Sequence, residues 1–421
     1  MIFDRVKYGL VTISSLIWCI CIDAHAISLK EVEKIALKEA PELAQLRHSE
    51  YSLRESAVAA GQLSDPKLQA GLINVPTDSF DLDQENMTQM KFSLVQNFPK
   101  GRTLSVKSRQ INMLANAESF KTLDTKGKIL QMVRNDWLSL YYWYEADKII
   151  KENKRIFKQL VEITESMLAA GKKSQHDVLR AYLELSKIEN HQIHIKKEIG
   201  ISHANLARWV GNGISNQIIP NKLPQWLPPP SSELLSLLVK NHPQIKKDSS
   251  VISASRQGVK LAKQEYFPGW ALNLSYSYRR GNIPNMDNKR ADFVGAQVTL
   301  DLPVFTKNRQ NKVLKASKEN LHAMQNIQIS DYRKMTAEAE QELVKWKKLT
   351  EQKKLYKDKL IPESKQHAKA TLIAYQNDKS DFLTVIRAYI IDLDTQLENL
   401  KINVDRAKTR VSLFYLEGAD L

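Results

Sequence analysis

The sequence has almost no cysteine and no long apolar run. Its only cysteines, Cys19 and Cys21, lie near the N-terminus, and no stretch of eighteen apolar residues occurs anywhere in the chain. A protein that crosses a membrane several times as helices needs about 20 apolar residues for each span, so this class is excluded. Transmembrane strands alternate apolar and polar residues and leave little such signal, so they stay open.

The N-terminal segment has the pattern of a secretion signal. Arg5 and Lys7 precede an apolar run at residues 9–22 that is too short to span a bilayer, and residues 24–26 (Ala-His-Ala) fit the small-x-small cleavage rule. We expect residues 1–26 to be removed on export, which leaves a mature chain without thiol or disulfide chemistry. A buried N-terminal helix or a membrane anchor is the alternative interpretation.

The sequence also lacks the motifs of common enzymes. It contains no phosphate-binding loop, no zinc-protease histidine pair and no serine elbow. The formal charge of +15 is spread among acids along helical patterns. On an exported chain such charge suits anionic lipid better than nucleic acid. We therefore expect no enzyme activity, no cofactor and no nucleic-acid partner.

The chain contains an internal repeat. Four residues of the first half recur in the same order in the second half, 202, 202, 204 and 207 residues later. The pairs are Pro41 and Pro243, Pro66 and Pro268, Pro99 and Pro303, and Arg180 and Arg387. A connector with five prolines, residues 220–230, separates the copies. Because clustered prolines form extended, semi-rigid chain, we expect one repeat over 27–219 and a second over 231–421.

Each repeat predicts a helix, two strands and two long helices. The expected strands are Lys67–Asn74, Met90–Asn97, Trp270–Tyr278 and Phe293–Leu300. In the third strand apolar and small polar side chains alternate, which indicates one apolar and one wet face. An ordinary half-buried sheet would show the same alternation.

The long helices have a coiled-coil pattern. From Thr103 to Ala170 the chain has no proline, so a helix of roughly 100 Å is expected. Seven-residue spacing appears first at Leu123, Leu130, Trp137 and Tyr144, and then in a second phase at Ile149, Ile156 and Ile163. A similar helix over Asn308–Tyr375 is interrupted at Pro362, and turns at Gly171 and Asn377 start the return helices.

Two such hairpins and four strands cannot complete a structure alone. An open sheet edge in a membrane leaves its amides without partners, and about eight strands are the practical minimum for closure. Cyclic oligomerisation would pool strands into one barrel and hairpins into one tube. This reasoning leaves the number of copies open.

Several motifs resemble the outer-membrane factors of tripartite efflux pumps, the TolC-like family, over essentially the whole mature chain. Residues 171–181 are similar to the hairpin tip of that family, and residues 96–102 (QNFPKGR) resemble its strand-to-helix junction. Residues 65–76 with Met87 and Thr88 resemble the branch that serves heavy-metal pumps of the resistance-nodulation-division (RND) class, typified by CzcC and CusC.

The resemblance implies a mainly α fold with a small β part. It implies a homotrimer with a shared 12-stranded β-barrel in the outer membrane, and a helical α-barrel that extends through the periplasm. The partners would be a periplasmic adaptor, or membrane fusion, protein and an inner-membrane RND-type transporter. The chain would be a passive exit duct for substrates pumped elsewhere, with metal ions as one candidate substrate.

The resemblance also directs attention to the periplasmic tip. Family members carry aspartates in a D-V-L-D-A stretch of the second hairpin, whereas this chain has residues 384–388 (TVIRA), and the first repeat has residues 177–181 (DVLRA). The gate candidates are therefore Asp177, Arg180, Lys379, Thr384 and Arg387. If Arg387 lines the passage, it would favour anions or pair with Asp177 or Asp381. Arg180 and Arg387 could equally face solvent or pair between helices.

Small and polar residues at the tips are candidates for adaptor docking. They are Gly171, Ser174, Asn377 and Ser380. Ordinary helix-turn chemistry would select the same residue types. His191, His194 and His203 lie along one helix but lack a third ligand in register, so we expect no metal site.

Two other functions remain as alternatives. A periplasmic coiled-coil scaffold or adaptor would explain the long helices but not the four strands. An exported hydrolase would need a catalytic site that the sequence does not show. Residence in the outer membrane or free in the periplasm separates the duct from the scaffold.

Overall fold

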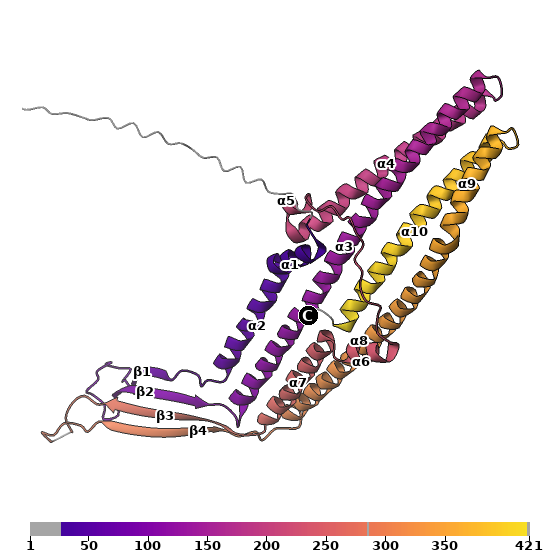
Figure 1. Cartoon of the computed structure of the whole chain (residues 1–421). Coiled ribbons are helices and arrows are strands. Elements are labelled where there is room, and N and C mark those ends of the chain that lie inside the picture. The colour runs from indigo at the N-terminus through magenta and orange to yellow at the C-terminus, as the bar shows by residue number, and fades with distance from the viewer. Residues whose placement is uncertain (1–26, 284–285, 419–421) are drawn as a thin grey trace, which may run out of the picture.

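The structure is a computed structural model that describes residues 27–283 and 286–418. It is an elongated molecule with a four-stranded sheet at one end and two long helical hairpins that point away from it (Figure 1). The hairpin tips lie together at the far end. The predicted signal segment, residues 1–26, lies outside the described residues.

The first half of the chain starts with two helices and a strand pair. The capping box of Ser28 and Glu31 starts the first helix, because each side chain binds the other residue's backbone N–H. The elements of this half are α1 (Leu29–Glu39), α2 (Pro41–Ala60), β1 (Lys67–Ile73), β2 (Gln89–Phe98), α3 (Thr103–Ala169), α4 (Gln175–Val210) and α5 (Asn212–Ser215).

The second half repeats this order. Its elements are α6 (Ser232–Lys240), α7 (Pro243–Gln264), β3 (Gly269–Tyr278), β4 (Phe293–Asp301), α8 (Gln310–Leu355), the π-helical turn η1 (Tyr356–Leu360), α9 (Ile361–Gln376) and α10 (Phe382–Glu417). All four strands were predicted from the sequence to within one residue at each end. The mainly helical fold with a small sheet is confirmed.

The interruption predicted at Pro362 is a π-helical turn. Proline has no N–H and would clash with the carbonyl four residues earlier, so an α-helix through Pro362 would lose a hydrogen bond. The chain inserts the five-residue turn η1 just before it, and Ile361 N–H bonds to Tyr356 O. The helix continues beyond the proline to Gln376.

The second tip turns one residue later than the sequence predicted. Gly171 has φ +68°, as a left-handed turn residue, but Asn377 has φ −98° and Asp378 takes the left-handed conformation with φ +57°. Asn377 instead ends α9, and its side-chain Nδ2 donates to Ile373 O at 2.8 Å. Aspartate tolerates left-handed backbone, so it can replace glycine here.

The apolar core follows α3, which packs against α2, α4, α7 and α10. In the first predicted seam Leu130 and Trp137 are buried, whereas Leu123 and Tyr144 are half-buried. In the second seam Ile149 and Ile156 are half-buried and pack against the core, while their neighbours Ile150 and Phe157 are fully buried. A straight α-helix drifts by about 20° for each heptad, which moves the buried line along the sequence.

A buried polar contact links the two halves near the middle of the molecule. His242 caps α7 by accepting Gln244 N–H, and its Nε2 lies 2.9 Å from Tyr415 O of α10. The Tyr415 hydroxyl donates to Asp124 of α3 at 2.8 Å. Burial lowers the pKa of His242, which favours the neutral ring that this cap requires.

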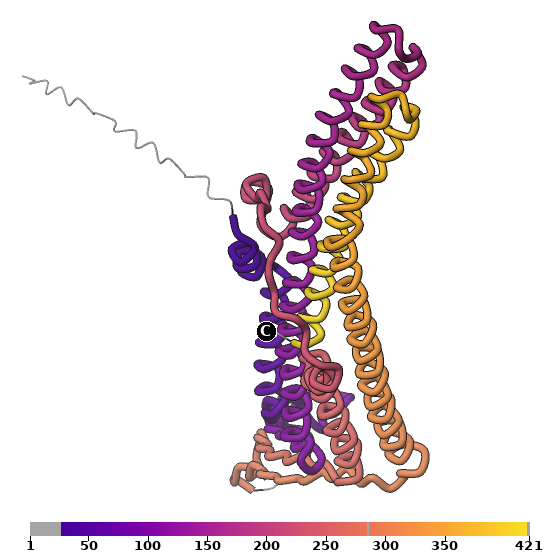
Figure 2. The backbone as a smooth tube through the Cα atoms, turned by 45° about the vertical axis from the view of Figure 1, so that its right-hand side comes forward, coloured from indigo at the N-terminus to yellow at the C-terminus, as the bar shows by residue number. Residues whose placement is uncertain are grey.

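The proline-rich connector lies on the long helices on its way from α5 to α6 (Figure 2). The Trp226 ring meets the Phe414 ring of α10 edge-on at 5.6 Å. Arg410 of α10 donates from Nε to Leu227 O at 2.7 Å. The two terminal nitrogens of Arg410 bind both carboxylate oxygens of Glu417, at 2.6 and 3.3 Å. The connector is therefore attached to the second hairpin.

Candidate functional site

The sheet has one apolar and one polar face. Its strands are antiparallel in the order β1-β2-β3-β4, so the central β2–β3 pair joins the two halves of the chain. Partners in the register share a face. The apolar face carries Leu68, Leu72, Phe92, Leu94, Leu272, Leu274, Tyr276, Val294, Val298 and Leu300. The polar face carries Lys67, Gln69, Lys91, Ser93, Asn97, Asn273, Ser275, Gln297, Thr299 and Asp301.

The apolar face is open in this chain. Val294 is 85% exposed, Leu68 is 75% exposed and Val298 is 59% exposed. Soluble monomers rarely leave such a continuous apolar surface in water, so this face marks contact with lipid or with another protein. No helix in the described ranges is long and apolar enough to cross a membrane.

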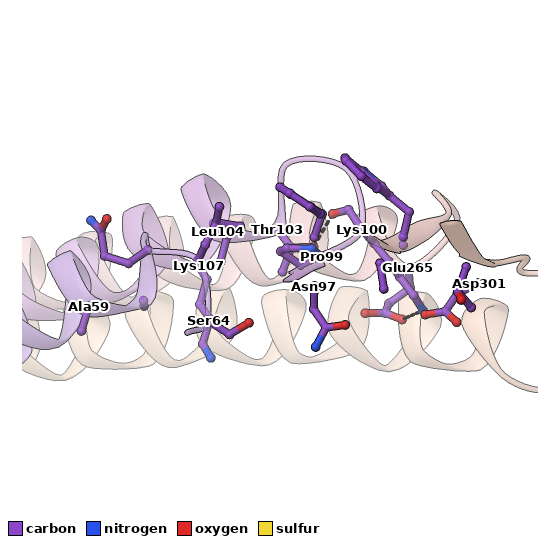
Figure 3. Close-up of a pocket in the computed structure, with 18 residues that line it drawn as sticks. Ala59, Ser64, Asn97, Pro99, Lys100, Thr103, Leu104, Lys107, Glu265 and Asp301 are labelled. Carbon is purple, nitrogen blue, oxygen red and sulfur yellow. Dashed lines mark hydrogen bonds and ion pairs between the residues drawn. The ribbon is translucent and has the colours of Figure 1, made fainter. Parts of the chain in front are cut away.

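A wide pocket lies where the polar face meets the helices (Figure 3). It has a volume of about 780 Å³, and Asn97, Asp301, Lys107 and Ser64 line it together with the Lys100–Glu265 pair. Lys100 Nζ lies 2.7 Å from Glu265 Oε2, so the start of α3 is tied to the end of α7. The pocket continues the polar face of the sheet onto the helices.

Glycine is favoured at position 101 of this joint. Its φ is +49°, and a Cβ atom there would lie 2.5 Å from Gln264 Oε1. That oxygen accepts the N–H of Arg102 at 2.8 Å, so a side chain at position 101 would break the contact that aligns α3 with α7. The junction motif at residues 96–102 thus has a geometric role.

The two hairpin tips contact each other. Lys173, in the turn before α4, places its Nζ 2.9 Å from Asp378 Oδ1 and 4.8 Å from the centre of the Tyr375 ring. Burial raises the pKa of Tyr375 to about 12, with smaller contributions from Asp177 and Asp378. An ion pair and a cation–π contact therefore tie the first hairpin to the second.

The structure brings most of the gate candidates near one carboxylate. Asp381 accepts the N–H of Thr384 at 2.8 Å and so caps α10. That hydrogen bond lowers the pKa of Asp381, and Arg387 and Arg180 lower it further. Arginines from both tips therefore stabilise the same acid. Arg387 is exposed, and Arg180 is half-buried, with no hydrogen-bond partner for its Nε among the described residues.

The remaining candidates lie on the surface of the tips. Gly171, Ser174, Asn377 and Lys379 are exposed, and Asp177 and Ser380 are half-buried. Ser174 is the N-cap residue of α4 but its side chain makes no capping hydrogen bond. The structure brings these residues to one end of the molecule.

Sequence reasoning missed Lys173, Asp378 and Tyr375. All three lie within five residues of a predicted turn, which is the signal that could have marked them. Their contacts depend on how far one hairpin extends beside the other, and no local pattern gives that offset.

One histidine of α4 is held by structural contacts, and two others lie on the surface. His203 lies 3.1 Å from the Tyr144 hydroxyl through Nε2 and 2.8 Å from Ser215 O through Nδ1, while His191 and His194 are exposed. Across the described residues no group of three or more His, Cys, Asp or Glu side chains is placed to hold a metal ion. The contacts of His203 are structural.

Comparison with known proteins gives one family match and several structures with the same fold. Residues 234–419 match the family described as outer membrane efflux protein. No curated protein sequence matches the chain.

Solved structures share the fold over nearly the whole chain at low sequence identity. The outer-membrane channel OprN is 16% identical, with 93% of this chain and 90% of OprN covered and a TM-score of 0.79. CusC, described as forming a transmembrane channel, is 16% identical, with 93% of this chain and 92% of CusC covered and a TM-score of 0.75. The outer membrane protein VceC from Vibrio cholerae is 15% identical, with 93% of this chain and 96% of VceC covered and a TM-score of 0.75. The second half of this chain thus matches the outer membrane efflux protein family, and the chain as a whole has the fold of outer-membrane channels.

Proposed function

We propose that this chain is the outer-membrane exit duct of a tripartite efflux system and is not an enzyme. The observation that carries the proposal is the two-faced sheet with two open edges. Within the described chain β1 and β4 each have one strand partner, so both edges must pair elsewhere. Strands of further copies would close the sheet with its apolar face toward lipid and its polar face toward a water-filled passage.

The long helices also need neighbouring chains to cover their apolar side chains. Only Gln310, Met335 and Ala339 are buried along the 46 residues of α8. Its exposed side chains include Val313, Ile327, Ile329 and Val344. Three copies would supply twelve strands and six hairpins, enough for one barrel and one tube. The homotrimer is therefore part of the proposal.

The rest of the assembly follows from the family and the fold. The match to outer membrane efflux proteins supports a periplasmic adaptor and an inner-membrane transporter as partners. The RND type of that transporter is proposed from the motif at residues 65–76. The exposed tip residues Gly171, Ser174, Asn377 and Ser380 are the proposed docking positions. Metal export rests on the motif at residues 65–76 alone, because the chain is as similar in sequence to OprN as to CusC.

The native mass of the detergent-extracted protein tests this proposal. We expect the processed chain in the outer-membrane fraction, with a particle mass three times that of one chain. A monomer or dimer in the soluble periplasm would contradict the duct and favour a coiled-coil scaffold.

The proposed gate predicts a change of ion selectivity at Arg387. Replacing Arg387 by Asp in a trimer exchanges three positive for three negative charges at the tip, beside Asp381. We expect the reversal potential of the channel in a planar bilayer with a salt gradient to shift toward cation selectivity. Lys365→Asp, which makes the same charge change at an exposed position of α9, is the control. Equal shifts in both variants would exclude Arg387 from the passage.

A further inference from the structure

A second cavity lies beneath the connector, far from the sheet and from the tips. It has a volume of about 350 Å³. Trp226 of the connector, Trp346 and Lys353 of α8, and Asn403 and Arg406 of α10 are among the residues that line it. Three segments that are distant in the sequence therefore meet around one polar space. Nothing in the proposed function uses this cavity.

The cavity has unbalanced positive charge. No acidic side chain is among the residues that line it in the described chain. Arg410, which also lines it, is neutralised by the two-pronged contact with Glu417. Lys353 and Arg406 have no carboxylate within 4.0 Å among the described residues. Two half-buried cations therefore face a shared space without a counter-charge.

The guanidinium of Arg406 is held in place by groups that leave its terminal nitrogens available. It lies 3.8 Å above the Trp346 ring, and its Nε donates to Thr350 Oγ1 at 2.9 Å. The structure gives the two terminal NH₂ groups no acceptor among the described residues. An arginine fixed by stacking and by one hydrogen bond presents its remaining donors in a rigid fork, the geometry that binds carboxylate and phosphate.

Burial and mutual repulsion both disfavour the charged forms of Lys353 and Arg406. Burial lowers the pKa of Lys353, and Arg406 and Lys357 lower it further. Burial also lowers the pKa of Arg406. A bound anion would remove this mutual repulsion and stabilise both charged forms.

We propose that this cavity is an oxyanion-binding site, in which Arg406 and Lys353 hold a carboxylate or phosphate group and Asn403 supplies a further polar contact. The guanidinium fork of Arg406 would take two oxygens of the anion. Lys353 would bind as a point charge from the opposite helix. The connector, with Trp226 and Gln225, closes the cavity on its third side.

Calorimetric titration of the intact detergent-extracted protein tests the site. The probes are inorganic phosphate and, in a separate experiment, N-acetylglycine, both at constant ionic strength set with chloride. We expect saturable binding of one anion per chain. Lys353→Met and Arg406→Gln should each weaken it about tenfold or more, because each removes a charged hydrogen bond.

Two further variants make the result decisive. Lys354→Met removes a neighbouring exposed lysine that does not line the cavity, and it should change the affinity less than about twofold. Arg406→Lys keeps the charge but loses the fork, so it should bind with intermediate affinity. Binding of phosphate alone identifies a phosphate source, and binding of N-acetylglycine alone identifies a carboxylate source. Absence of binding by both probes, or equal losses in Lys354→Met and Lys353→Met, would overturn the proposal.

Discussion

Val298→Arg is expected to prevent assembly of the protein in the outer membrane. Val298 lies in the middle of β4 on the apolar face, opposite Leu272, and is 59% exposed in the single chain. If this face meets lipid, an arginine near the midplane costs about 2–4 kcal/mol in each copy. The measurement is the amount of folded oligomer in the outer-membrane fraction, compared with total protein.

The adjacent residue on the same strand gives a matched control. Gln297 points to the polar face, opposite Asn273, so Gln297→Arg places the same side chain toward the proposed passage. We expect near-normal assembly of this variant, since lumen positions tolerate charge. If both variants assembled equally well, or if only Gln297→Arg failed, the assignment of the two faces would be wrong.

Glu417→Gln is expected to destabilise the folded protein strongly. The substitution leaves the guanidinium of Arg410 without its carboxylate, in a place where the two side chains are only 5% and 10% exposed. Breaking a buried ion pair by removing one partner costs about 3–5 kcal/mol, because the remaining charge stays buried and unpaired. Thermal unfolding of the extracted protein measures the loss.

An exposed pair on the same helix provides the comparison. Lys401 and Glu398 lie 3.9 Å apart, with side chains 56% and 47% exposed. We expect Glu398→Gln to change the free energy of unfolding by less than about 1 kcal/mol, because water and salt screen such pairs. Equal shifts in both variants would show that Glu417 is not effectively buried in the assembled protein.

The sequence predicted the elements well because their signals are local. Alternation in residues 270–278 and the proline-free stretch after Thr103 reflect the periods of strand and helix, which each segment carries by itself. The repeat supplied the same prediction twice. In the second seam of α3, Ile150 is more deeply buried than the predicted Ile149, because a helix with 3.6 residues per turn drifts relative to a 3.5-residue repeat.

The contacts between segments could not be read in the same way. The Lys173–Asp378 pair joins residues 205 positions apart, and it requires both hairpins to end at nearly the same height. The cavity below the connector is formed by residues from three segments. In the sequence, Lys353 and Arg406 look like any other lysine or arginine. Charge balance within a fold depends on packing, which local periodicity does not specify.

The π-helical turn η1 makes the two hairpins mechanically unequal. In the first hairpin, the 67 residues of α3 form one unbroken α-helix. In the second, the turn at Tyr356–Leu360 and the proline that follows interrupt the regular backbone ladder between α8 and α9. Bending stiffness is lowest where that ladder is interrupted. A force applied at the tips would therefore flex the second hairpin first, about a fixed pivot, while the first behaves as a rigid strut.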